Sequence, residues 1–411
     1  MEALANSYKL QLDERIKCYE EEYLKLWNTI SYDFPSLQMY SKAEKMLREA
    51  KIKKTLIQHK SKLKNLRKIE SEEDEKTVFI IKKVIEEAIG FHKEQLDLIY
   101  NEGFYNNLIN FEEEAQKFIQ DNEPSKGIAL RGDVYQATRT VMISAMMQLM
   151  FDKPISITPS LFAINMIYIY TDNYIDDPKT DKKSKMEFSK KISKYLLGER
   201  VLPQNEKEEI IFKLIDLFRL EYQQEEYEDL YNSLYYLHKA QEDSFVKQQH
   251  EINTSSVDDM LKITMEKGGV FAIADGYLIK GHISYEAEKF CYGLGTFLQF
   301  IDDLQDVQSD LQTGNMTVFS KTIVEGDTLD NVTNKAIQFI KETLDSEIIV
   351  SHKQKLVRDF VIHSCTYLIF ETIAINSKYY SDEYVEQAEK HMPLSLGFLK
   401  NLRSTLEEHL S

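Results

Sequence analysis

The chain has 411 residues, of which 43% are hydrophobic and 29% charged, and its formal net charge is −17. This balance is typical of a globular protein and not of a disordered or membrane one, while the negative charge argues against nucleic acid as a partner. Because only 14 glycines and 7 prolines punctuate the chain, we predict an all-α fold and exclude a β-rich one.

The N-terminus and the cysteines bear on the compartment. Residues 1–16 are charged where a signal peptide would be apolar, and no run approaches the roughly 20 apolar residues of a membrane span. Cys18, Cys291 and Cys365 are far apart, show no metal-site spacing and leave one cysteine unpaired. We therefore predict a cytoplasmic protein, with transient contact with a membrane surface left open.

Residues 1–75 are polar and heavily charged, and we predict that they form a helical segment preceding an α-domain over residues 76–411. A basic stretch from Lys42 to Lys68 is followed at once by an acidic run from Glu70 to Glu75. The pattern favours a solvated helical hairpin, and a docking surface for a partner is the alternative.

Prolines, glycines and capping residues divide most of the remaining chain into predicted helices. Thr158 is a good N-cap, Pro159 suits the first helical position, and Gly314 is typical of the residue that follows a helix. The glycine pair 268–269 is expected to interrupt its helix. The predicted helices span residues 130–150, 159–177, 185–197, 205–221, 223–250, 256–280 and 284–312, with two or three more before Ser411.

The first of two acidic clusters lies at the end of the predicted helix 159–177. Asp172, Asp176 and Asp177 follow a stretch that is almost wholly apolar or aromatic. Asp172 and Asp176 are a like-charge pair one turn apart, and all three aspartates lie where the helix dipole is already negative. This local conflict predicts that something outside the helix compensates the charge.

The second cluster repeats the conflict. Asp302, Asp306 and Asp310 recur every four residues and so form one stripe, with Asp303 on its flank, on another mostly apolar helix. One such cluster is unremarkable in so acidic a chain, but two on apolar helices about 130 residues apart indicate a functional site. Mg²⁺, which binds carboxylate oxygens together with substrate phosphates, would supply the compensation.

These segments resemble the aspartate-rich motifs of the class I isoprenoid synthase superfamily, which includes terpene cyclases, chain-elongating prenyl diphosphate synthases and squalene/phytoene synthases. Residues 172–177 are similar to the first motif, with Asn173 in place of its usual second aspartate, and residues 299–317 are similar to the second. The resemblance covers roughly residues 125–380. It implies a large helical bundle of the class I isoprenoid synthase type with an extra N-terminal helical segment.

The resemblance also implies roles for individual residues. Catalytic carboxylates would be Asp172, Asp176, Asp302, Asp306 and Asp310, and Asp177 and Asp303 would join them as ligands of Mg²⁺, with three ions expected. Diphosphate would be bound by Arg131, Lys267, Lys378 and Tyr379, with Arg139 as a weaker candidate. For each of these basic residues an ordinary surface charge is the alternative. Cavity-lining residues would be Asn165, Tyr168, Ile169, Gly295, Leu298 and Gln299, each of which could equally be plain core.

At some positions this chain differs from the family's motifs, and these differences bear on which branch of the family it resembles. Elongating enzymes carry an Arg-Arg pair after the first motif, where this chain has residues 178–183, Pro-Lys-Thr-Asp-Lys-Lys. The cyclases' diphosphate-sensing arginine also has no counterpart, so that Lys262 or Lys267 would replace it. We expect a Mg²⁺-dependent terpene synthase, a lyase that ionises a linear prenyl diphosphate and converts the allylic cation to a terpene.

Three alternatives stay open: a chain-elongating prenyl diphosphate synthase, a head-to-head prenyltransferase of the squalene/phytoene type, and a non-catalytic helical partner subunit. The expected partner is the prenyl diphosphate substrate, and a homodimer is left open. Substrate chain length and product skeleton do not follow from these residues.

Overall fold

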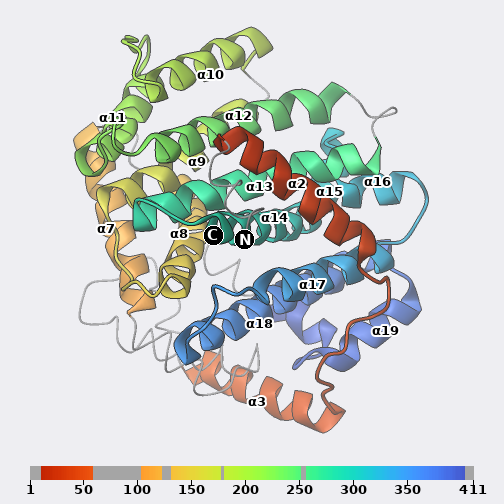
Figure 1. Ribbon diagram of the computed structural model, residues 1–411. Coiled ribbons are helices and arrows are strands. Elements are labelled where there is room, and N and C mark those ends of the chain that lie inside the picture. The colour runs from red at the N-terminus through yellow and green to blue at the C-terminus, as the bar shows by residue number, and fades with distance from the viewer. Residues whose placement is uncertain (1–10, 59–102, 123–130, 177–179, 251–255, 403–411) are drawn as a thin grey trace.

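The computed structural model describes residues 11–58, 103–122, 131–176, 180–250 and 256–402. Within these ranges every regular element is helical, which confirms the predicted all-α fold (Figure 1). In chain order the elements are α2 (Leu12–Thr29), α3 (Lys42–Gln58), α7 (Phe104–Asn122), α8 (Arg131–Met150), α9 (Pro159–Asp176), α10 (Lys182–Leu196), α11 (Glu206–Glu221), α12 (Glu228–His250), α13 (Val257–Lys280), α14 (Tyr285–Gln305), α15 (Val307–Thr313), α16 (Val318–Val324), α17 (Asp330–Leu344), α18 (His352–Ile375), the short 3-10 helix η1 (Ser377–Tyr379) and α19 (Asp382–His391).

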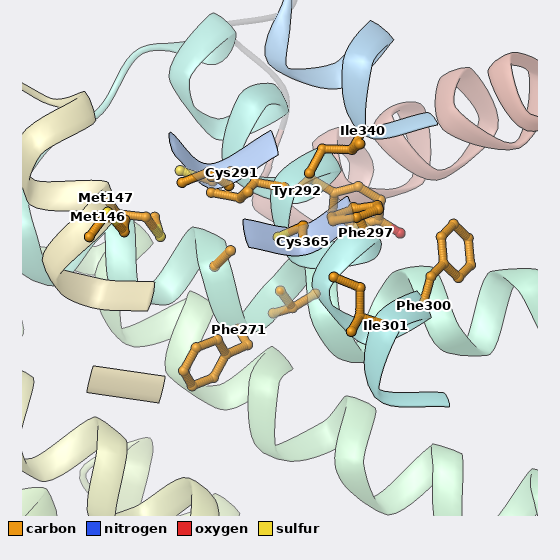
Figure 2. Close-up of a cluster of buried hydrophobic side chains, with 14 of the residues drawn as sticks. Met146, Met147, Phe271, Cys291, Tyr292, Phe297, Phe300, Ile301, Ile340 and Cys365 are labelled. Atoms are coloured by element: carbon orange, nitrogen blue, oxygen red, sulfur yellow. The ribbon is translucent and has the colours of Figure 1, made fainter. Parts of the chain in front are cut away.

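Helices α13 and α14 pack along each other at the centre of the bundle (Figure 1). Helices α9 and α12 flank α13, helices α17 and α18 flank α14, and α2 contacts both central helices. Most residues of both central helices are buried, as expected of helices that pack against neighbours on most sides. Figure 2 shows side chains of α8, α13, α14, α17 and α18 meeting in this core, among them Met146, Phe271, Phe297, Ile340 and Cys365.

Local capping chemistry fixes several of the predicted boundaries. The Leu161 N–H donates to Thr158 Oγ1 at 3.2 Å, so Thr158 caps α9 as predicted. Ser284 caps α14, and Gly314 follows α15 with a left-handed backbone, φ +75°. Helix α10 begins earlier than predicted because Asp181 caps it, and α12 begins later because residues 222–227 form a turn.

The glycine pair 268–269 does not interrupt its helix, contrary to the prediction, because α13 is continuous through it. The glycines allow close packing instead. A Cβ on Gly268 would lie 2.2 Å from the carbonyl oxygen of Gly295, and a Cβ on Gly269 would lie 2.5 Å from the Tyr292 ring. The absence of side chains at these positions therefore brings α13 and α14 into direct backbone contact.

The predicted helix 284–312 is divided in two. Helix α14 ends at Gln305, and Asp306 separates it from α15 with a backbone of φ −88° and ψ 2°. Backbone hydrogen bonds still run from the Asp306 N–H to Asp302 O and from the Asp310 N–H to Asp306 O, both at 2.9 Å. The second acidic segment therefore bends at its central aspartate but stays one connected stretch.

Within the predicted N-terminal segment, helix α2 is not solvated as its charge predicted, whereas α3 is largely exposed. Tyr19, Tyr23 and Trp27 of α2 are buried in the main core. Arg15 donates through Nε and a terminal nitrogen to both oxygens of Glu288 on α14, at 2.8 and 3.0 Å. The predicted boundary at residues 75–76 lies outside the described residues.

Among the described helices, none is both long and apolar enough to cross a lipid bilayer. All three cysteines have free thiols; those of Cys291 and Cys365 are buried.

Candidate carboxylate site

The two acidic segments face each other at one end of the central helices. The carboxylate of Asp172, in the last turn of α9, lies 3.5 Å from Nζ of Lys267 on α13. The pKa of Asp306 is raised, first by burial and then by the charge of Asp302, with a smaller contribution from Asp172. Carboxylates 130 positions apart in sequence thus share one local electrostatic environment.

Lys267 supplies positive charge between the two segments. Its side chain is 19% exposed, and its charge lowers the pKa of Tyr168, Asp303 and Asp306, although burial raises each of these pKa values overall. The close crossing at Gly268, the next residue, holds this part of α13 against α14. The structure therefore places Lys267 beside the acidic segments, and its binding of a diphosphate stays a prediction.

Asp303 is buried next to Asp302, and both of its carboxylate oxygens accept hydrogen bonds. Its Oδ1 accepts from Gln299 Nε2 and its Oδ2 accepts from Thr264 Oγ1, both at 2.8 Å. Burial raises the pKa of Asp303 to about 6, against the lowering effect of those two hydrogen bonds. Gln299 Nε2 also lies 3.5 Å from Asp302 Oδ2, so this amide links Asp303 to the neighbouring Asp302.

Among the arginines whose side chains the structure describes, Arg139 of α8 reaches the site. Its terminal nitrogen lies 3.1 Å from Asp302 Oδ1 and donates to Gln305 Oε1, also at 3.1 Å. Arg131, the stronger candidate by sequence, opens α8, but its side chain lies outside the described residues. Nothing in the local sequence marks Arg139, because its place depends on how α8 packs against α9 in the assembled bundle.

Asp306 and Asp310 differ in their surroundings. Asp306 is exposed to solvent, although the protein atoms around its carboxylate displace enough water to raise its pKa, whereas Asp310 is buried and its Oδ1 accepts from Asn315 Nδ2 at 3.1 Å. Burial raises the pKa of Asp310 to about 7, and the charges of Asp303, Asp306 and Asp302 add to that rise. The second segment therefore carries more negative charge than its protein surroundings compensate.

The carboxylate oxygens of these aspartates are ligands of the kind that Mg²⁺ prefers. A bound cation would compensate the negative charge that the protein leaves uncompensated. As placed, the acidic, histidine and cysteine side chains that the structure describes form no group of three around one point. The side chain of Asp176 and the whole of Asp177 lie outside the described residues. The donor chemistry fits a hard divalent cation, which Asp172, Asp302 and Asp306 would hold.

The predicted lysine-tyrosine pair lies beside the second segment. Lys378 and Tyr379 form part of η1, and Lys378 Nζ donates to Gln308 Oε1 of α15 at 3.2 Å. The ammonium also lies 4.7 Å from the centre of the Tyr379 ring. Lys378 is exposed, so it can turn toward an anion bound near α15.

The six predicted cavity residues have different surroundings. Asn165 is fully buried and Ile169 nearly so, Leu298 is half-buried, and Gln299 holds Asp303. Gly295 lies at the helix crossing, where no room exists even for a Cβ, so it lines no open space. The Tyr168 ring packs against the Phe271 ring, with centroids 4.8 Å apart.

A small apolar pocket lies on the side of α9 that faces α10, α11 and α12. Of the six predicted residues, Tyr168 alone lines it. The charges of Lys267 and Asp172 also act on the pKa of the Tyr168 hydroxyl. Tyr168 therefore lies between this pocket and the two acidic segments. The pocket is lined by Ile164, Ile167, Tyr168, Ile192, Leu196, Phe218, Leu234, Leu237, His238 and Gln241.

Comparisons of the chain with protein-family models, with curated proteins and with solved structures give no match. Chemically, the site combines clustered carboxylates, two basic side chains and an aromatic layer directly below. Such a combination can bind a polyanion through cations at its rim and keep an apolar group away from water beneath it.

Proposed function

We propose that this protein is a Mg²⁺-dependent class I terpene synthase acting on a linear prenyl diphosphate, in an α-bundle of the class I isoprenoid synthase type. One observation carries the proposal: acidic segments from α9 and from α14–α15 meet around Lys267 at one end of an apolar bundle. The three free thiols support a reducing, cytoplasmic location.

The basic residues give the site its preference for a phosphorylated substrate. Lys267 and Arg139 now pair with Asp172 and Asp302. When a diphosphate binds, each can donate charge-assisted hydrogen bonds to phosphate oxygens, while the released carboxylates hold cations. Bound Mg²⁺ would supply Lewis-acid compensation for the negative charge on the leaving diphosphate.

The proposed reaction begins with heterolysis of the allylic carbon–oxygen bond. The electron pair leaves with the diphosphate, whose charge Lys267 and Arg139 help to compensate, and the hydrocarbon is left as an allylic cation. The ring faces of Tyr168 and Phe271, which lie one turn below Asp172 and Lys267 on α9 and α13, can stabilise that cation. Loss of a proton or addition of water then gives a neutral terpene.

The test is incubation of the purified protein and Mg²⁺ with prenyl diphosphates of 10, 15, 20 and 25 carbons, measuring released diphosphate and extracted products. A hydrocarbon or alcohol from one substrate supports the proposal, whereas consumption of isopentenyl diphosphate with formation of a longer diphosphate indicates an elongase.

Variants connect the activity to the site. Asp172→Ala and Asp302→Ala should each lower turnover about a hundredfold or more, because each removes a ligand of the cations that would stabilise the leaving diphosphate in the transition state. Asp327→Ala, an exposed aspartate in the turn after α16, is the matched control and should leave turnover unchanged. Unchanged turnover in both site variants would show that the activity does not depend on these carboxylates, whereas absence of turnover from the folded, unmodified protein would indicate a non-catalytic helical subunit.

A further inference from the structure

A buried polar cluster lies below the aromatic pair Tyr168–Phe271. It joins Ser144 of α8, Asn165 of α9 and Asp275 of α13, whose exposed fractions are 2%, 0% and 0%. Ser144 Oγ donates to Asp275 Oδ1 at 2.9 Å, and Asn165 Nδ2 donates to Ser144 Oγ at 3.4 Å. The three side chains therefore form a directed hydrogen-bond chain that ends on a carboxylate.

Two acceptor atoms of this cluster have no hydrogen-bond partner among the described residues: Asn165 Oδ1 and Asp275 Oδ2. The orientation of the Asn165 amide is fixed, because its Nδ2 also donates to the carbonyl of Leu161 at 2.7 Å, and a carbonyl can only accept. An unpaired buried acceptor is costly. Asn165 Oδ1 therefore needs a donor from a group other than these side chains, Asp275 Oδ2 needs one whenever the carboxylate is ionised, and a water molecule offers two donors.

The cluster lies on the two helices that carry the rim of the site. Asn165 precedes Asp172 by seven residues on α9, and Asp275 follows Lys267 by eight on α13, which corresponds to about 10–12 Å along each helix. Phe271 lies midway between Lys267 and Asp275 on α13. Along α9 and α13 the charged side chains Asp172 and Lys267 therefore come first, the rings of Tyr168 and Phe271 come next, and the buried polar cluster comes last.

Asp275 can also accept a proton near neutral pH. Burial raises its pKa to about 7, against the lowering effect of its hydrogen bond from Ser144. The thiol of Cys291 is its electrostatic neighbour on α14, and burial raises the pKa of that thiol so that it stays neutral. The carboxylate thus combines a proton affinity suited to general-base chemistry with a place at the base of the apolar layer.

We propose that Asn165, Ser144 and Asp275 bind one water molecule beneath Tyr168 and Phe271, and that this water captures the carbocation, so that the product is a terpene alcohol. The inference rests on the proposed function and specifies its product class.

The step balances without a further reactant. A lone pair of the water oxygen forms a bond to the cationic carbon, which gives a protonated alcohol. One of its protons then passes to Asp275 Oδ2, and the neutral alcohol and a neutral carboxylic acid remain. The polar cluster lies about 10–12 Å along α9 and α13 from Asp172 and Lys267, so the water would meet the cation after the charge has moved along the hydrocarbon chain.

The experiment uses the full-length protein with Mg²⁺, the best prenyl diphosphate substrate and ¹⁸O-labelled water. Released diphosphate reports the proposed function, and the ratio of labelled alcohol to hydrocarbon reports the inference. We expect labelled alcohol as the main product of the unmodified protein. Asp275→Asn and Asn165→Leu should each lower the alcohol-to-hydrocarbon ratio by about tenfold, as loss of one charged or buried hydrogen bond typically does, while diphosphate is still released.

Thr343→Val is the matched control, because the Thr343 hydroxyl is another buried group without a described partner, on the remote helix α17. It should leave the product ratio unchanged. Diphosphate release with only hydrocarbon from the unmodified protein overturns the inference and leaves the proposed function standing, and so does an alcohol fraction that neither variant lowers. Absence of diphosphate release from the folded protein overturns both.

Discussion

Lys267 Nζ lies 3.5 Å from Asp172 Oδ1, so a cation from one central helix compensates part of the charge of the first acidic segment. Lys262 lies on the same helix but faces α2, where its Nζ is 3.9 Å from Glu20 Oε1. The two lysines differ in what they face and not in charge or length, and this makes them a matched pair.

Lys267→Gln should lower kcat/KM for the prenyl diphosphate by about 10- to 100-fold, because one charge-assisted hydrogen bond to the diphosphate is lost. Lys262→Gln should leave kcat/KM within about twofold of the value for the unmodified protein, as expected of an exposed charge outside the site. Steady-state kinetics with both variants is the measurement. Equal losses in the two would show that Lys267 has no special relation to the substrate.

Arg139→Gln should change metal binding and turnover in opposite directions. Its ion pair with Asp302 is largely exposed, so removing the arginine should tighten Mg²⁺ binding only roughly two- to fivefold in titration calorimetry without substrate. Turnover should nevertheless fall about tenfold, because the arginine no longer contacts the diphosphate. Arg358→Gln, which breaks a pair with Asp359 far from the site, is the control. A variant with weaker Mg²⁺ binding contradicts the assigned role.

The helix ends that depend on interactions within a few residues could be predicted from the sequence. The Thr158 cap and the glycine after α15 follow from side-chain and backbone preferences within a few residues, and the structure has both. Arg15 looked solvated because its partner Glu288 is 273 positions away. Such pairing depends on how α2 packs in the finished bundle, so no window of sequence could reveal it.

The glycine pair shows a second reason for error. A glycine within a helix can interrupt that helix or allow another backbone to pack closely against it. A single sequence does not distinguish these two effects. At residues 268–269 the second effect applies. Arg139 was only the weaker candidate for a similar reason, because the packing of α8 and not the local sequence brings it to Asp302, while the place of the Arg131 side chain stays a prediction.

Gly295→Ala should destabilise the protein by about 3 kcal/mol, because the new Cβ would lie 2.0 Å from the carbonyl oxygen of Gly268 and the central helices would have to separate. Gly397→Ala is the control, since it has no atom within 4 Å of its Cβ position. That exposed helical position should gain up to about 1 kcal/mol from alanine. Urea unfolding followed by circular dichroism measures both, and equal stabilities would contradict the close crossing.

Arg15→Met should lower the free energy of unfolding by about 3–5 kcal/mol, because it leaves the buried Glu288 carboxylate without its cation. Tyr19 and Tyr277 also donate to that carboxylate but carry no charge. Lys17→Met, on the same helix and paired only with exposed Asp13 at 3.9 Å, should change stability by less than about 0.5 kcal/mol. If both variants unfold at the same urea concentration, α2 contributes no buried ion pair to the core.

Asp275 should make stability fall as the pH rises. Burial raises its pKa in the folded state from 3.8 to about 7, so the folded protein holds a proton that the unfolded chain has released between those values. The stability gained from that proton is complete below about pH 3.8 and is lost as the pH rises through about 7. The full loss is on the order of 4 kcal/mol.

Asp275→Asn keeps the shape of the side chain and cannot ionise, so its stability relative to the unmodified protein should increase by about that amount between pH 4 and pH 8. Other carboxylates contribute equally to both proteins, and the difference therefore isolates Asp275. The measurement is urea unfolding at pH 4, 5, 6, 7 and 8, with the exposed Asp327→Asn as a control whose difference should stay flat. A flat difference for Asp275→Asn would mean that Asp275 has an ordinary pKa, and that it cannot take the proton from the captured water.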